Sequence, residues 1–245
     1  MKRPLIILAG PTAVGKTAAS IRLAKSVGAE IISADSMQVY RHMDIGSAKI
    51  RPDEMDGVPH YLVDVLEPEE EFNVVKFQNM AKAAMEQIYK KGKIPLVVGG
   101  TGFYIQALLY DIDFTENDGD DFFRRELEQT AEKEGSEALH ERLRDIDPAS
   151  AEQIHPHNKK RIIRALEFYH QTGQRISEHN ETERQKESPY QYAYFVLTDD
   201  RAKLYGRIDR RVDEMMKEGL LDEVCMLKER GVSRSLPAMQ GLGYK

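Results

Sequence analysis

Short apolar segments alternate with helical stretches along most of the chain. Five segments have the length and composition of β-strands: residues 5–9, 30–34, 60–65, 94–98 and 192–197. Short apolar strands that alternate with helices are typical of a parallel sheet covered on both faces. The pattern therefore predicts an α/β fold.

Two helices are expected between these strands, at about residues 15–27 and 74–91. In the second helix Asn73 suits the N-cap position. The apolar residues of this helix recur on one stripe: Val74, Phe77, Ala81, Ala84 and Ile88. We expect this stripe to face the sheet.

About 90 residues with helical patterning and no strand signal separate the fourth and fifth strands, which is too long for a loop inside a compact domain. Polar segments at 115–121 and 182–189 flank this region, and the first resembles a hinge. We therefore expect a helical insertion domain at 111–189 and a core formed by 1–110 and 190–245.

The charge of the chain is unevenly distributed. The 245 residues include 35 basic and 41 acidic side chains, a net charge of −6, which alone argues weakly against a nucleic-acid partner. Residues 111–150 hold 5 basic and 14 acidic side chains, so this segment carries −9 and the rest of the chain +3. The total charge therefore excludes no nucleic-acid partner.

Cysteine content and hydropathy exclude other classes. The single cysteine, Cys225, excludes an internal disulfide and a zinc site built on cysteine pairs, so a reducing, cytoplasmic location is the default. No apolar run approaches the roughly 18–20 residues of a membrane span.

The strongest chemical signal directly follows the first strand. Its sequence fits G-x-x-x-x-G-K-[ST], and a strand before it and a helix after it are the context of a phosphate-binding loop. Backbone N–H groups and the helix N-terminus would form the cradle, Lys16 would supply a charge and Thr17 a hydroxyl for Mg²⁺. The alternative is a chance glycine-rich turn. The residues of the loop are Gly10, Pro11, Thr12, Ala13, Val14, Gly15, Lys16 and Thr17.

Polar residues follow two further strands. Asp35 comes directly after the second strand, where a carboxylate can bind Mg²⁺ or act as a general base; a helix N-cap is the alternative. Gly99, Gly100 and Thr101 follow the fourth strand, where an NTP hydrolase usually carries an aspartate. This departure weakens the hydrolase hypothesis and favours close approach of a ligand to the backbone, although a simple turn before a helix also explains it.

A basic segment without acidic interruption spans residues 155–164. Helical spacing places Lys160, Arg161 and Arg164 on one face together with Phe168, and Ile162 with Tyr169 on the opposite face. A basic face with an aromatic residue suits a nucleic-acid backbone, and a solvated helix face is the alternative. The pair His155 and His157 has no third ligand in view, which favours a structural role over a metal site.

One long helix is expected at about residues 200–228, with Leu204, Ile208, Val212 and Met215 as its buried stripe. Arg207 and Arg211 lie beside that stripe, where they can reach a phosphate across a cleft. Salt bridges with Asp209, Asp213 or Glu214 are the alternative.

These motifs converge on one family. The chain resembles the bacterial tRNA dimethylallyltransferase (tRNA isopentenyltransferase) family in the order and spacing of six segments: GPTAVGKT (10–17), ADSMQVY (34–40), HYLVDV (60–65), VVGGTGFY (97–104), HNKKRIIRALE (157–167) and RIDRRV (207–212). The resemblance implies a P-loop NTPase-like parallel sheet flanked by helices. It also implies transfer of a dimethylallyl group from dimethylallyl diphosphate to N6 of adenosine 37 in tRNA.

The resemblance implies roles for single residues. Asp35 would be the general base, Thr101 would contact substrate near the reacting centre, and Arg207 with Lys16, Thr17 and Mg²⁺ would stabilise the departing diphosphate. The segments expected to contact the tRNA anticodon stem-loop are Asp35, Ser36, Met37 and Gln38, together with Thr101 and with Lys160, Arg161, Ile162, Ile163 and Arg164. We expect a monomer with no membrane partner.

The chain departs from the family pattern at its end. In the family, a motif such as residues 240–245 is followed by further helices that contact tRNA, so we expect a fragment or a truncated product with reduced tRNA affinity. Two alternative functions remain. A P-loop small-molecule or nucleotide kinase explains Lys16, Thr17 and Asp35 but not the basic segment, and a non-catalytic RNA-binding module leaves Asp35 and Arg207 without a task.

Overall fold

The structure is a computed structural model that describes residues 2–114 and 121–245, so most of the expected hinge at 115–121 lies outside the described residues. The chain divides into two compact units. Unit 1 comprises Met1–Asp111 and Ser188–Lys245, and unit 2 comprises Ile112–Glu187. That unit 2 is an insertion domain that folds independently stays a prediction.

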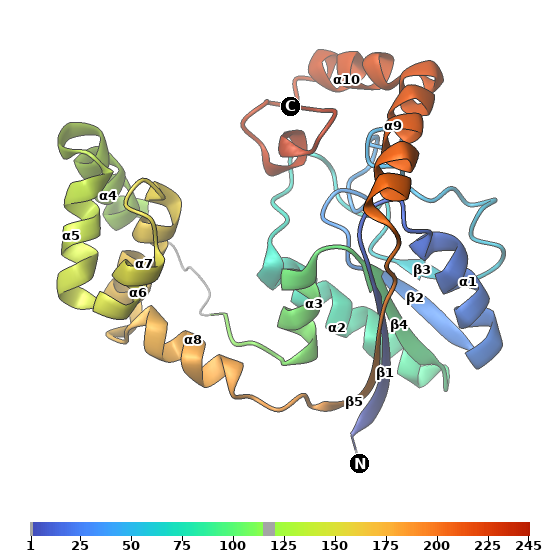
Figure 1. The fold of residues 1–245 in the computed structure, drawn as a ribbon, viewed down its shortest axis with the longest axis horizontal. Coiled ribbons are helices and arrows are strands. Elements are labelled where there is room, and N and C mark those ends of the chain that lie inside the picture. The colour runs from blue at the N-terminus through green and yellow to red at the C-terminus, as the bar shows by residue number, and fades with distance from the viewer. Residues whose placement is uncertain (1, 115–120) are drawn as a thin grey trace. The chain divides into compact units, whose positions relative to one another are not determined.

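Unit 1 is built on a parallel sheet of five strands in the order β3-β2-β4-β1-β5 (Figure 1). The sheet places Ile7 beside Val97 on one side and beside Tyr194 on the other. The parallel α/β sheet expected from the sequence is confirmed. The strands are β1 (Arg3–Ala9), β2 (Ala29–Ser33), β3 (His60–Tyr61), β4 (Ile94–Gly99) and β5 (Tyr190–Val196).

The third strand is much shorter than predicted. The pattern of residues 60–65 alternates, yet β3 ends at Tyr61 because Leu62 and Asp64 have positive φ angles of 61° and 59°. Extended backbone requires negative φ, so the chain turns away from the sheet after two residues. Alternation alone therefore overestimated this strand.

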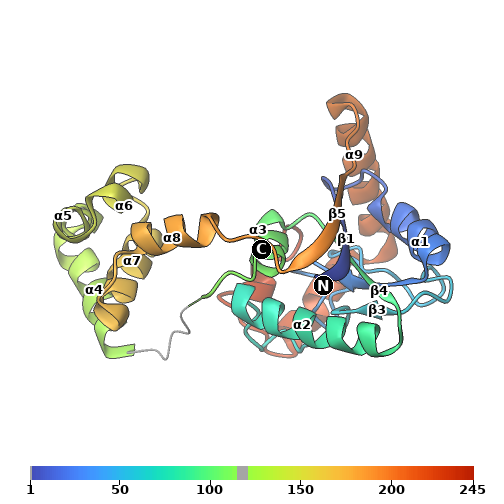
Figure 2. The same cartoon turned by 90° about the horizontal axis from the view of Figure 1, so that it is seen from below.

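Helices cover both faces of the sheet (Figures 1 and 2). Helix α1 (Lys16–Val27) buries Ile21 and Ala24 against one face, whereas α2 (Val74–Lys90) and α3 (Gly102–Leu109) pack on the other. The stripe predicted for α2 is buried or partly buried as expected. The side chain of Asn73 accepts the N–H of Lys76 at 2.9 Å, which confirms the N-cap.

The C-terminal part of unit 1 forms two helices and a short 3₁₀ turn: α9 (Arg201–Glu218), α10 (Leu220–Glu229) and η1 (Pro237–Gln240). The prediction of one helix at 200–228 was wrong because Gly219, at φ 103°, takes a left-handed conformation that breaks the helix. The predicted buried stripe was also wrong: no residue of α9 is buried, and Val212 is 48% exposed.

Unit 2 consists of helices throughout its described residues: α4 (Asp121–Glu134), α5 (Ser136–Ile146), α6 (Pro148–Gln153), α7 (Lys159–Thr172) and α8 (Ile176–Arg184). Leu127, Leu143 and Leu166, from α4, α5 and α7, form its core together with other apolar residues of these helices and of α6. Within the described residues of the whole chain, no helix is long and apolar enough to cross a lipid bilayer.

A buried carboxylate joins two helices of unit 2. Asp147 is 1% exposed and precedes α6, where it accepts the N–H of Ser150 at 3.0 Å and its hydroxyl at 2.7 Å. At the start of α8, Ser177 donates its N–H at 3.0 Å and its hydroxyl at 2.6 Å to the same carboxylate. Although burial opposes ionisation, these four hydrogen bonds lower the pKa of Asp147 below its ordinary value.

Candidate active site

The loop of residues 10–17 connects β1 to α1 at the carboxyl edge of the sheet. Ala13 and Gly15 have positive φ angles of 62° and 91°, so the backbone curls before the helix begins at Lys16. No side chain caps this helix N-terminus. The first-turn N–H groups therefore remain available to an anion, as a phosphate-binding loop requires.

Lys16 lies folded over this loop. Its Nζ donates to the carbonyl oxygens of Gly10 at 2.9 Å and Pro11 at 2.7 Å. Burial lowers the pKa of Lys16, the nearby Asp35 partly offsets that effect, and Arg211 adds to it. The lysine is therefore a charge held beside the loop, near a carboxylate and a second cation.

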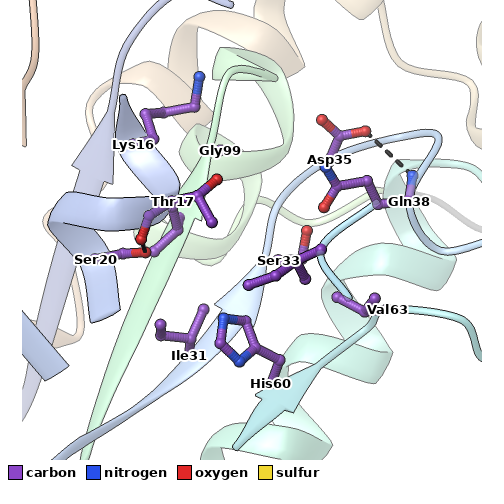
Figure 3. A pocket seen from close by; sticks show the side chains of 12 residues that line it. Lys16, Thr17, Ser20, Ile31, Ser33, Asp35, Gln38, His60, Val63 and Gly99 are labelled. Carbon is purple, nitrogen blue, oxygen red and sulfur yellow. Dashed lines mark hydrogen bonds between the residues drawn. The ribbon is translucent and has the colours of Figure 1, made fainter. Parts of the chain in front are cut away.

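A pocket brings the loop together with residues after β2 (Figure 3). Lys16 and Thr17 come from the start of α1, and Asp35 and Gln38 from the segment that follows β2. Ser20, Ser33 and His60 complete the polar lining, and Gly99 and apolar side chains complete the wall. The apolar lining residues are Ile31, Ile50, Val63 and Val98.

Asp35 shapes its own turn as well as the pocket. Its Oδ1 accepts the N–H groups of Met37 at 2.8 Å and Gln38 at 3.3 Å. Asp35 therefore does cap its turn, as the alternative interpretation expected, and it uses only one carboxylate oxygen to do so. The carboxylate still lines the pocket, so capping and a catalytic role are compatible.

Strand packing explains why a glycine stands at the end of β4. A Cβ at Gly99 would lie 2.3 Å from the carbonyl oxygen of Ala34, because β4 passes close to the end of β2. Thr101 follows as the N-cap residue of α3, half-buried and without a side-chain capping bond. Thr101 does not belong to the pocket lining. Packing between strands therefore accounts for at least one of the glycines expected to approach a ligand.

Arg207 links α9 to the phosphate loop. One guanidinium nitrogen donates to the carbonyl oxygen of Ala13 at 3.1 Å, and another pairs with Asp199 at 2.5 Å. The salt-bridge partner is thus Asp199 rather than the acidic residues of the helix itself. One turn further, burial lowers the pKa of Arg211, while the charge of Asp35 partly offsets this effect.

The residues that could hold a metal are few. In residues 2–114 and 121–245, no group of three or more His, Cys, Asp or Glu side chains could bind a metal ion. The rings of His155 and His157 lie 5.1 Å apart, and the backbone N–H of His157 donates to Nδ1 of His155 at 3.2 Å. A hydroxyl and a carboxylate, from Thr17 and Asp35, line the pocket together.

The basic segment, residues 155–164, leads into α7 and forms its first turns in unit 2, where its side chains differ in exposure. Lys160 and Arg161 are exposed and Arg164 is half-buried. Ile162 and Ile163 are 0% and 2% exposed, so their side chains belong to the core of unit 2 and are not available to an RNA surface.

The predicted pairing of faces on α7 was wrong for its two aromatic residues. Phe168 is buried and Tyr169 is 39% exposed, the reverse of the expectation. The reason is that the buried face of α7 is broad, including Ile162, Ile163 and Phe168 among its members.

Sequence reasoning missed part of the pocket. Ser33 and Ile50 line it, yet neither belongs to a recognisable motif, and His60 lies in the family-like segment 60–65 without an expected role. Burial lowers the pKa of His60, whose Nδ1 lies 2.8 Å from the carbonyl oxygen of Val58. His60 lies near the end of β2 because β3 pairs with β2, and local patterning carries no signal for that pairing.

Known proteins resemble the chain over its whole length. The family model "IPP transferase" matches residues 38–245. The tRNA dimethylallyltransferase of Lachnoclostridium phytofermentans is 65% identical over 243 residues, which are 99% of this chain and 78% of that protein. The tRNA dimethylallyltransferase of Bacillus licheniformis is 52% identical over 244 residues, 100% of this chain and 77% of that protein.

Solved structures agree. The full-length tRNA isopentenylpyrophosphate transferase of Bacillus halodurans matches with a TM-score of 0.69 and 44% identity, covering 100% of this chain and 75% of that one. A eukaryotic dimethylallyltransferase acting on tRNA matches with a TM-score of 0.82 and 32% identity, covering 93% and 56%. The chain, with its P-loop-like sheet, therefore belongs to the IPP transferase family of enzymes.

Proposed function

We propose that the protein transfers a dimethylallyl group from dimethylallyl diphosphate to N6 of adenosine 37 in tRNA, releasing diphosphate. The observation that carries the proposal is the pocket in which Lys16 and Thr17 of the phosphate loop meet Asp35. If the diphosphate group of dimethylallyl diphosphate binds this loop, the reacting carbon C1 of the donor would lie near the carboxylate of Asp35. The relatives named above support the substrates.

The chain's residues would divide the reaction between them. An exocyclic adenine amine is a weak nucleophile, so alignment with C1 of the donor matters. As the N6–C1 bond forms, Asp35 accepts the N6 proton and the electron pair of the C1–O bond leaves with diphosphate. Lys16 and Arg207 would stabilise the charge that develops on the leaving group, because both lie at the phosphate loop.

The pocket offers an oxygen ligand that suits Mg²⁺. Mg²⁺ usually takes one or two protein oxygens and completes its shell with phosphate oxygens and water. The Thr17 hydroxyl, which lines the pocket, is a ligand of that kind. A bound Mg²⁺ would neutralise charge on the diphosphate, and Thr17 would hold it.

We assign the tRNA contacts to two places. Residues 35–38 and Thr101 lie at the carboxyl edge of the sheet in unit 1, where the target base would enter after leaving the anticodon-loop stack. Lys160, Arg161 and Arg164 would bind the RNA backbone from unit 2. Ile162 and Ile163 would support these cations through packing rather than through contact. A monomeric state and a cytoplasmic location stay predictions.

One assay tests the proposal. The protein is incubated with dimethylallyl diphosphate, Mg²⁺ and unmodified tRNA, and prenylated adenosine is measured by mass spectrometry of the digested RNA. We expect product only when all three are present. ATP-dependent phosphorylation of a metabolite without prenylation would establish a P-loop kinase instead. Tight tRNA binding without either reaction would establish an RNA-binding module.

A further inference from the structure

A buried carboxylate near the C-terminus binds the loop that follows the candidate base. Glu223, on α10, is 8% exposed. Its Oε2 accepts the N–H groups of Asp44 and Ile45, each at 2.8 Å, and its Oε1 accepts that of Gly46 at 3.1 Å. Three successive N–H groups that converge on one carboxylate form a backbone anion nest, here filled from within the chain.

Tyr244 completes this contact. Its hydroxyl donates to Oε1 of Glu223 at 2.5 Å, and its ring lies against Gly46. A Cβ on Gly46 would come within 2.6 Å of that ring, so only glycine fits there. Burial, and then the bond to Glu223, raise the pKa of Tyr244, so the phenol stays protonated and donates at neutral pH.

The loop held in this way also forms part of the pocket. The Nε2 of Gln38, which lines the pocket, donates to the carbonyl oxygen of Ala48 at 3.0 Å. The N–H of Gln38 in turn donates to Asp35. A shift of residues 44–46 would therefore reach Gln38 and then the turn that Asp35 caps.

The end of the chain touches the same turn a second time. A Cβ on Gly241 would lie 2.5 Å from Cε of Met37, so this methionine packs directly on residue 241. Met37 therefore packs on residue 241 directly, and Gln38 is linked to Glu223 through the loop of residues 44–48.

We propose that Glu223 and Tyr244 are positioning residues for the prenyl transfer, fixing the 35–48 loop so that Asp35 and Gln38 face the pocket. The inference rests on the proposed function, since it assumes that this pocket is where the reaction occurs. Displacing a reacting group by about 1 Å can cost up to a hundredfold in rate, so a loosened loop would lower kcat. The phosphate loop has no part in the contact, so donor binding would persist.

The test compares Glu223→Gln with Glu229→Gln, the same change at an exposed position of the same helix. In Glu223→Gln an amide NH₂ would face at least one N–H of the nest. We expect hydrogen exchange of the amides of residues 44–46 to accelerate at least tenfold. At a temperature where the variant is fully folded, we expect kcat to fall about tenfold while KM for dimethylallyl diphosphate stays within twofold. Glu229→Gln changes neither.

A milder variant guards against misfolding. Tyr244→Phe removes the hydroxyl that donates to Glu223 and keeps the ring, and we expect a smaller loss of kcat, about threefold. Faster exchange with unchanged kcat, or unchanged exchange, in Glu223→Gln would overturn the positioning role. A fall in stability with kcat per folded molecule intact would do the same. If the wild-type enzyme transfers no prenyl group, the proposed function fails first, and that outcome is distinct from an active wild type with an indifferent Glu223.

Discussion

The two units assemble their candidate residues in opposite ways. In unit 1 the pocket draws Lys16, Asp35 and His60 from three segments that only the parallel sheet brings together. In unit 2 the exposed cations Lys160 and Arg161 are adjacent on one helix. Chemistry at one atom needs groups that converge from several directions, whereas binding an RNA backbone needs only a charged surface.

The difference predicts distinct consequences of mutation. A change at the pocket should affect the rate of transfer more than tRNA affinity, because the residues assigned there meet the target base rather than the RNA backbone. A change on α7 should affect tRNA binding and leave the chemical step nearly intact.

The largest effect is expected for Asp35→Asn. The amide oxygen can still accept the N–H groups of Met37 and Gln38, so the turn is preserved, but the side chain cannot take a proton from the substrate. We expect single-turnover transfer to fall roughly 1,000-fold, with little change in diphosphate affinity. Asp53→Asn, at an exposed position, is the control. A rate close to wild type would refute the general-base assignment.

Arg207→Ala should follow with roughly a 100-fold loss of kcat, equivalent to about 2.7 kcal/mol of transition-state stabilisation. The reason is that Arg207 bonds to the phosphate loop at Ala13 and lies where negative charge develops. Arg210→Ala is the matched control, since Arg210 is exposed and bonds to its own helix at Gly206. Equal losses in both variants, measured by steady-state kinetics, would show a general effect on α9.

Asp147→Ala tests the independence of unit 2. Removing a buried carboxylate that caps one helix and accepts four hydrogen bonds should lower the stability of unit 2 by about 2 kcal/mol. Because the folded-state pKa is lowered, the stabilisation is fully present above the ordinary pKa of 3.8 and is lost as pH falls below it.

Calorimetry with diphosphate present measures this effect. We expect the transition of unit 2 to shift while diphosphate binding in unit 1 is retained. A single transition that shifts as a whole, with binding lost, would show that the two units unfold together and would remove the contrast.

The smallest effect is expected for Lys160→Ala combined with Arg161→Ala. We expect about a tenfold weaker tRNA affinity and a slope of log K against log salt that is smaller by about 1.5, because two phosphate contacts are lost. The turnover number at saturating tRNA should not change. Lys133→Ala with Arg184→Ala removes the same charge from exposed positions elsewhere in unit 2. If filter binding gives the same slope for both double variants, α7 has no special role.

Local sequence patterns predicted much of the fold. The Asn73 cap, the stripe of α2 and four of the strands follow from residues that are close in sequence. The errors arose where one residue or a neighbour overrides the pattern. Gly219 ends a helix whose apolar periodicity continues beyond it, and positive φ at Leu62 ends a strand whose alternation continues.

The candidate site was only partly predictable for the same reason. The phosphate loop and Asp35 stand out because their motifs are contiguous and follow strands directly. Other contacts could not be predicted because they join segments that are distant in sequence. They are the ion pair of Arg207 with Asp199, the meeting of Ser33 and His60 in the pocket, and the hydrogen bonds of Glu223 to residues 44–46.

Local sequence specifies which chemical groups this protein has and which strands and helices carry most of them, because propensity, capping and loop motifs act over a few residues. The tertiary structure alone decided which groups meet. Asp35 and Lys16 line one pocket because parallel strands end at one edge of the sheet, and Glu223 reaches the 44–46 loop because a buried carboxylate must find donors wherever packing brings them.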